Sequence, residues 1–126
     1  MEKQYLYILS NDKHPGLLKI GGTSKDPAVR ADRLTHQTAA IGKFVVEWYM
    51  VVPDWRLAEK MAHFLLKNYH DYKEFHKLSS IDAVNQIQDK ISSFFGSYKP
   101  YIFKSELFIQ RERMIELEED LKKLNF

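Results

Sequence analysis

The chain contains no cysteine among its 126 residues, and this absence excludes a disulfide framework and any metal site built from thiolates. It has only five glycines and four prolines, and it shows no internal repeat and no low-complexity tract. No apolar run approaches the roughly 20 residues that a membrane span requires. The apolar stretch before Ser10 is also too short for a signal peptide. We therefore expect a cytoplasmic protein without a membrane partner, in the host cytoplasm if the chain is viral.

Hydrophobic residues make up 44% of the chain and charged residues 29%, which is typical of a globular protein with a single core. The formal net charge of +2 at pH 7 neither requires nor excludes a nucleic-acid partner. Basic residues outnumber acidic ones only in the first two-thirds of the chain, which also holds every histidine. The groups suited to an anionic partner therefore lie in that part.

Three segments are predicted to be β-strands, at residues 5–10, 17–21 and 43–52. A short turn that contains Pro15 and Gly16 joins the first two, so we expect an antiparallel hairpin. The third segment alternates between two series of residues, Phe44, Val46, Trp48 and Met50 in one and Glu47 and Tyr49 in the other. A further short extended segment is indicated at 74–78.

Helices are predicted at residues 27–36, 55–69, 80–95 and 103–124. The first two begin after Asp26 and Asp54, whose side chains suit N-cap positions, and Ser79 and Ser80 start the third. In the second helix an apolar stripe is expected from Leu57, Met61, Phe64 and Leu65. The order of elements indicates an α+β fold with a small three-stranded antiparallel sheet flanked by helices, and with an extra C-terminal helix.

We place a domain boundary after Gly96, so that residues 1–96 form the domain and residues 97–126 form a C-terminal helical extension. In the extension, apolar residues recur at intervals of seven: Leu107, Met114 and Leu121, and also Leu117 and Leu124. Two interpretations of this pattern stay open. The helix either docks on its own domain or forms a short coiled coil that makes a homodimer through residues 103–124.

Polar residues of the predicted elements could share one surface. Tyr7 and Lys19 are expected on the same face of the hairpin, Arg30 and Arg33 on the next helix, and Glu59 on the helix after it. A carboxylate can hold a hard divalent cation, and arginine binds phosphate oxygens. A phenol or an amine can then position or deprotonate water. These residue types around glycines suit phosphodiester hydrolysis.

Five short motifs follow one another along the chain: YLYILSN from Tyr5, LKIGGT from Leu18, DPAVR ending at Arg30, AEKMAH at 58–63 and KEF at 73–75. Together and in this order they resemble the GIY-YIG nuclease superfamily. The closest resemblance is to its phage- and virus-rich branch, whose second half-motif reads K-I-G. The resemblance covers about residues 4–95 and implies a GIY-YIG-like nuclease domain.

The resemblance implies that Tyr7, Lys19, Arg30 and Glu59 are catalytic. Glu59 would bind one Mg²⁺ or Mn²⁺ ion against the scissile phosphate, and Arg30 would stabilise the charge that develops in the transition state. Tyr7 with Lys19 would orient or activate the attacking water. Because Lys19 stands where the superfamily usually has a tyrosine, the choice of base between the two stays open.

Other residues are candidates for binding nucleic acid alongside Lys19 and Arg30. Gly21 and Gly22 allow a close approach of the backbone, and Arg33 is a candidate phosphate contact.

Three more residues are candidates for supporting the site. Tyr5 stands where the superfamily has a glycine. Relatives often carry a histidine one turn after the arginine, where this chain has Leu34, so His36 and His63 are the candidate replacements.

The residues and the resemblance together predict a metal-dependent endonuclease that hydrolyses phosphodiester bonds in DNA, whether single-stranded, duplex or branched. RNA is not distinguished from DNA at this stage. One alternative is a catalytically weak nucleic-acid-binding module of the same fold. Another is an interaction protein that acts through its C-terminal helix.

Overall fold

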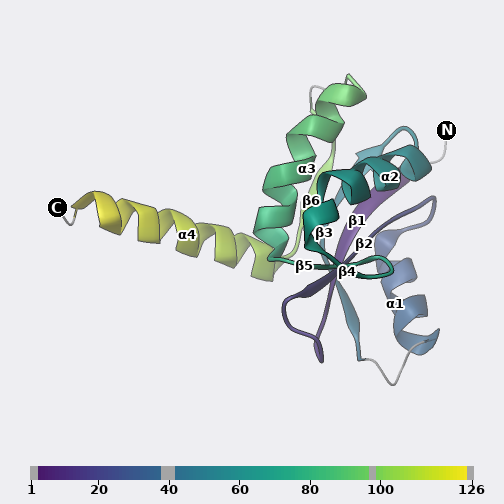
Figure 1. The fold of residues 1–126 in the computed structure, drawn as a ribbon, viewed down its shortest axis with the longest axis horizontal. Helices are drawn as coiled ribbons and strands as arrows, with labels where there is room; N and C mark the ends of the chain where they lie inside the picture. Colours follow the sequence, from purple (N-terminus) through teal and green to yellow (C-terminus); the bar gives the residue numbers. More distant parts are fainter. Residues whose placement is uncertain (1–2, 38–41, 97–98, 125–126) are drawn as a thin grey trace.

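The computed structural model describes residues 3–37, 42–96 and 99–124. Six strands form one antiparallel sheet in the order β4-β5-β2-β1-β3-β6 (Figure 1). The strands are β1 Gln4–Asn11, β2 Leu17–Thr23, β3 Phe44–Val52, β4 His70–Tyr72, β5 Phe75–Lys77 and β6 Ile102–Lys104. The helices are α1 Pro27–Gln37, α2 Trp55–Leu65, α3 Ser80–Phe94 and α4 Glu106–Leu124, with a 3₁₀ turn at Lys67–Tyr69. None of the helices in these ranges is long and apolar enough to cross a bilayer.

The α+β class is confirmed, but the sheet is larger than the three strands predicted. The predicted strands form its centre, β2-β1-β3, and three short strands extend it at both edges. The extended segment indicated at 74–78 is β5, which pairs with β4 on one side and β2 on the other. At the opposite edge, β6 pairs with β3.

Two predicted helix boundaries are wrong, one because α2 is capped at Leu66 and one because sheet pairing takes over Phe103 and Lys104. Helix α2 ends at Leu65, not at residue 69, and the chain passes through a 3₁₀ turn into β4. The predicted last helix begins too early, since Phe103 and Lys104 pair with β3 and α4 starts at Glu106. Residues 97, 98, 125 and 126 of the predicted extension lie outside the described residues.

The two predicted helix caps are confirmed, since the Asp26 carboxylate accepts a hydrogen bond from the Ala28 N–H and the Asp54 carboxylate accepts from Arg56 and Leu57. In the third helix the Ser79 hydroxyl is the cap and accepts from the Asp82 N–H. Gly96 follows α3 with φ of +68°, a left-handed conformation that suits glycine and ends the helix. The N-cap residues therefore fix where α2 and α3 begin against the sheet.

Strand β3 carries a β-bulge at Glu47, which breaks the predicted alternation. Ile8 pairs with Trp48 and Leu9 pairs with Val46, so Glu47 is an extra residue on β3. Residues before and after the bulge consequently pack on different faces, Phe44 and Val46 on one and Trp48, Met50 and Val52 on the other.

The two faces of the sheet are covered by different helices (Figure 1). Helices α2 and α3 pack on the face of Leu6 and Ile8, and α1 packs on the face of Tyr7 and Leu9. The predicted stripe of α2 is confirmed for Met61 and Leu65, which are half-buried against the core, whereas Leu57 and Phe64 stay exposed. The buried residues of this helix are Ala58 and Ala62, and these small side chains let α2 lie close to β2.

Helix α4 extends away from the rest of the molecule (Figure 1). Phe108 is its buried residue among those described, at 1% exposure. The first turns also hold the sheet through polar contacts, since Arg111 bonds to Glu47 of β3.

Candidate active site

The candidate site lies at an edge of β2. Strand β5 pairs with β2 from Leu17 to Lys19, and the next contact is the Ile20 N–H bond to the Glu74 carbonyl. Further along β2, the Gly22 N–H donates instead to the Glu59 carboxylate of α2, at 2.8 Å from N to Oε2. The strand edge that β5 leaves open is therefore closed by a side chain from a helix.

Gly21 and Gly22 are both needed to fit their neighbours on this chain. A Cβ on Gly21 would lie 2.5 Å from the hydroxyl oxygen of Tyr7, and a Cβ on Gly22 would lie 2.6 Å from the Trp55 ring. The tyrosine therefore lies against one glycine and the start of α2 against the next. Their predicted contact with nucleic acid stays a prediction.

Tyr7 is buried on the α1 face of the sheet, with 1% of its surface exposed. Burial raises the pKa of its phenol above the ordinary value, while a hydrogen bond and the positive charge of Arg30 lower this pKa in part. The carboxylates of Glu74 and Glu59 add to the increase. Tyr7 is therefore a neutral phenol at pH 7, in contact with the guanidinium of Arg30.

Glu59 is half-buried on α2. Burial raises the pKa of its carboxyl, whereas the Gly22 N–H bond and the charges of His63 and Lys19 lower it. The nearby carboxylate of Glu74 raises the pKa further. The net effect is a raised pKa, so this carboxyl holds its proton more tightly than an exposed glutamate does.

Lys19 forms an ion pair with Glu74, at 2.5 Å between Nζ and Oε2. The Lys19 side chain is 11% exposed, and its ammonium lies 5.5 Å from the centroid of the Phe75 ring. Glu74 is not among the predicted site residues, although it belongs to the KEF motif. The KEF motif was therefore the feature of the sequence that could have identified Glu74 as a site residue.

Side chains from four elements and from the turn between β4 and β5 meet at this edge of the sheet. Tyr7 of β1 lies close enough to Arg30 of α1 and to Glu59 of α2 for each to change its pKa. Lys19 of β2 and Glu74 beside β5 are also close enough to change the pKa of Glu59, Lys19 lowering it and Glu74 raising it. The four predicted catalytic residues are therefore brought together, with Glu74 added to them.

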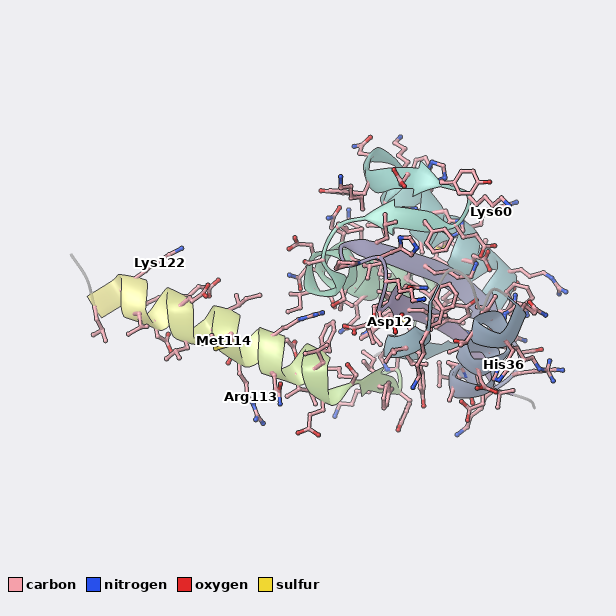
Figure 2. All side chains as sticks on the ribbon, turned by 90° about the horizontal axis from the view of Figure 1, so that it is seen from below. Asp12, His36, Lys60, Arg113, Met114 and Lys122 are labelled. Atoms are coloured by element: carbon pink, nitrogen blue, oxygen red, sulfur yellow. The ribbon has the colours of Figure 1, made fainter. Side chains whose placement is uncertain are left out.

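The two histidine candidates, His36 and His63, differ in their distance from the site. The ring of His63 lies close to Glu59, and its Nε2 is 2.7 Å from the Ile20 carbonyl oxygen. His36 is exposed on α1 (Figure 2), and its Nδ1 lies 2.8 Å from the carbonyl oxygen of Asp32 on the same helix. Of the two, only His63 contacts the residues of the site.

The other two candidates lie beside the site. Arg33 is exposed on α1, one turn after Arg30. Tyr5 packs edge-to-face on Tyr49, with ring centroids 5.2 Å apart, on the sheet face that carries Tyr7.

The residues present fit a single divalent cation bound through one carboxylate. In the described part of the chain, no three side chains of His, Cys, Asp or Glu form a ready metal cage. Mg²⁺ does not need one, since it is often held by one or two carboxylates together with water and substrate phosphate. A hollow of about 320 Å³ lies beside Glu59 and is lined by Trp55, Arg56, Glu59, Lys60 and His63.

Comparison with known families agrees with this geometry. The model of the T5orf172 domain matches residues 4–95, which is most of the chain. The chain belongs to the T5orf172 domain family. The T5orf172 domain is a GIY-YIG-like, phage-associated domain of nuclease type, so the predicted superfamily is supported at this level. The search of curated proteins and the search of solved structures gave no match.

The T5orf172 match ends just before the predicted domain boundary at residue 96. Strand β6 and helix α4 follow the matched region, yet β6 pairs with β3 in the same sheet. The segment after the T5orf172 domain is therefore attached through main-chain hydrogen bonds as well as through Phe108.

Proposed function

We propose that the protein is a metal-dependent endonuclease that hydrolyses phosphodiester bonds in DNA. The main support is the meeting of Tyr7, Arg30 and Glu59 at the edge of β2, in a chain of a nuclease-type family. A guanidinium and a carboxylate near a buried phenol can hold a phosphate, a cation and a water molecule together.

The proposed roles follow from the charges at the site. Glu59 would hold Mg²⁺ or Mn²⁺, and the bound cation would polarise the scissile phosphate. Arg30 would donate to the phosphate oxygens as negative charge develops. Tyr7, as a neutral phenol, would position the attacking water. Lys19, paired with Glu74, would act as an electrostatic contact to the phosphate.

The activity test uses circular single-stranded DNA and supercoiled plasmid with Mg²⁺, Mn²⁺ or EDTA. We expect metal-dependent cleavage, and we expect Glu59→Gln to lower the rate at least about a hundredfold because the cation loses its carboxylate. The matched control is Glu119→Gln, an exposed glutamate of α4 that should keep full activity.

Equal rates for Glu59→Gln and the wild type would contradict the proposed metal site. An absence of cleavage, combined with salt-dependent retention on DNA, would instead identify a binding module.

We further propose that α4 pairs with α4 of a second copy. Its heptad residues are exposed along one stripe: Leu107 48%, Met114 56%, Leu117 53%, Leu121 51% and Leu124 74%. Arg113 and Asp120 occupy the same heptad position beside this stripe. In an antiparallel pair, Arg113 of one copy would therefore face Asp120 of the other.

A further inference from the structure

Four aromatic side chains form a row that runs from Tyr7 to the edge of the sheet at β6. We call Tyr5, Tyr49, Tyr101 and Phe103 the aromatic row. Tyr7 pairs directly with Tyr49 across β1 and β3, and Tyr49 pairs with Phe103 across β3 and β6. Directly opposite residues of antiparallel strands place their Cβ atoms about 4.5–5.5 Å apart and on the same face. The row therefore begins beside the candidate active site.

The rings of the row contact one another around Tyr49. Tyr49 stacks on Phe103 with centroids 5.0 Å apart and an interplanar angle of 13°. Tyr101 lies 6.1 Å from Tyr49 at 30°, and Tyr5 meets Tyr49 edge-on. Such contacts hold aromatic side chains in fixed orientations, so the row presents a preformed surface.

Packing within the sheet explains only part of this arrangement. Tyr5, Tyr49 and Phe103 are half-buried, as expected for cross-strand aromatic neighbours. Tyr101 keeps 63% of its surface exposed although it contacts Tyr49. Helix α1 packs on Tyr7, Leu9 and Phe44 of the same face, and the row continues from there to the edge strand. An aromatic surface thus remains accessible next to the site.

We propose that the aromatic row stacks an unpaired base of the strand whose phosphate is held at Arg30. This inference rests on the proposed function and specifies its substrate: the DNA is single-stranded at the point of cleavage. A base within a duplex has both of its faces stacked on neighbouring bases, whereas an unpaired base can stack on aromatic side chains.

Groups of both charge signs lie around the row. Burial, Tyr101, Tyr5 and the Asp26 carboxylate raise the pKa of Tyr49, whose phenol is neutral at pH 7 even at its ordinary pKa of about 10. Lys3 lies two residues before Tyr5, and Lys99 lies two residues before Tyr101. Both lysines are exposed and can contact the phosphate backbone.

The test measures DNA affinity in EDTA, so that cleavage does not interfere. A fluorescein-labelled single-stranded oligonucleotide and the duplex of the same sequence are titrated with protein, and anisotropy is recorded. We expect Tyr101→Ala to weaken single-strand binding about tenfold and to leave duplex binding unchanged. Tyr101→Phe should bind the single strand like the wild type, because the stacking ring remains.

Phe94→Ala is the matched control. Phe94 is an exposed aromatic residue, at 59%, and it lies on α3, which covers the opposite face of the sheet. This variant should bind both DNAs like the wild type. A second measurement places an abasic site at successive positions of the oligonucleotide. One position should weaken binding to the wild type and have no effect on Tyr101→Ala.

The outcomes separate this inference from the proposed function. If Tyr101→Ala binds the single strand like the wild type while Arg30→Ala loses affinity, the row binds no base and the nuclease proposal stands. Equal losses of affinity for single strand and duplex would also overturn the inference. If the protein cleaves no DNA but shows the tenfold selective loss, base stacking stands and the nuclease proposal fails.

Discussion

Glu59 is placed so that two ligands compete for one carboxylate. Its Oε2 accepts the Gly22 N–H, which favours the ionised form, while burial on α2 disfavours it. The net effect raises the pKa, so the folded protein binds a proton at Glu59 more tightly than the unfolded chain does. Ionisation of Glu59 without a bound cation therefore destabilises the folded protein.

This environment predicts that Glu59→Gln raises Tm at neutral pH in EDTA. Because the folded pKa is raised, the stabilisation linked to Glu59 is full below the unfolded pKa and is lost as pH rises through the folded pKa. A glutamine is neutral at every pH and can still accept the Gly22 N–H. The Tm difference from the wild type should therefore vanish at acidic pH.

Thermal unfolding measured from acidic to neutral pH checks the prediction. Glu119→Gln is the control, and its Tm difference from the wild type should not change with pH. A lower Tm of Glu59→Gln at neutral pH would contradict the proposed cost of ionisation. Loss of cleavage together with unchanged or greater stability would also separate a role in the reaction from a role in folding.

At the residue scale, the sequence identified those members of the site that carry a recognisable motif. Tyr7, Arg30 and Glu59 were predicted from motif positions and lie close together. Glu74 was not predicted, because its ion pair joins residues 55 positions apart and depends on the pairing of β5 with β2. His36 and His63 were equivalent in sequence, and only tertiary packing distinguishes them.

At the element scale, the bulge in β3 gives a buried carboxylate three partners. Glu47 is 1% exposed, and it accepts hydrogen bonds from Ser10, Ser80 and Arg111. These donors come from β1, α3 and α4. Glu47 therefore connects the sheet to α3, which covers one face, and to α4, which extends away from the sheet.

We predict that Glu47→Ala destabilises the protein by about 2–3 kcal/mol, since it leaves buried donors without an acceptor. Arg111 is 49% exposed and recovers water, which keeps the loss below that of a fully buried pair. Urea unfolding measures the change. Glu112→Ala is the control, because its pair with Lys104 is about one-third exposed on both sides and should contribute about 1 kcal/mol or less. Equal losses for the two variants would show that the Glu47 network does not stabilise the fold.

The elements differ in how far the sequence could predict them. The central strands and the starts of α2 and α3 follow from apolar patterns and cap residues. Strands β4, β5 and β6 have three residues each, too few to show a period, and they exist through pairing with longer strands. The bulge at Glu47 moved Trp48 to the opposite face from Val46, a change that alternation alone does not reveal.

At the scale of the whole molecule, α4 is the feature that packing within one chain leaves unexplained. The helix projects from the sheet, and Met114 and Lys122 lie along its free part (Figure 2). Most helical stability in proteins comes from burying an apolar face against a neighbour rather than from the helix itself. Burial of the exposed heptad stripe against a second copy would supply that stabilisation.

Pairing through α4 predicts a mass of two chains in sedimentation equilibrium, and a mass of one chain when Leu117 and Leu121 are both changed to serine. Both side chains are about half exposed, so the fold of each copy should survive the change. Ile115→Ser is the control: Ile115 lies on the same helix, is 40% exposed and falls outside the heptad stripe. Its variant should remain a dimer, because Ile115 occupies a heptad position away from the seam that a coiled coil buries. A wild-type mass of one chain at every concentration would exclude pairing, and equal dissociation by Ile115→Ser would place the contact on another face of α4.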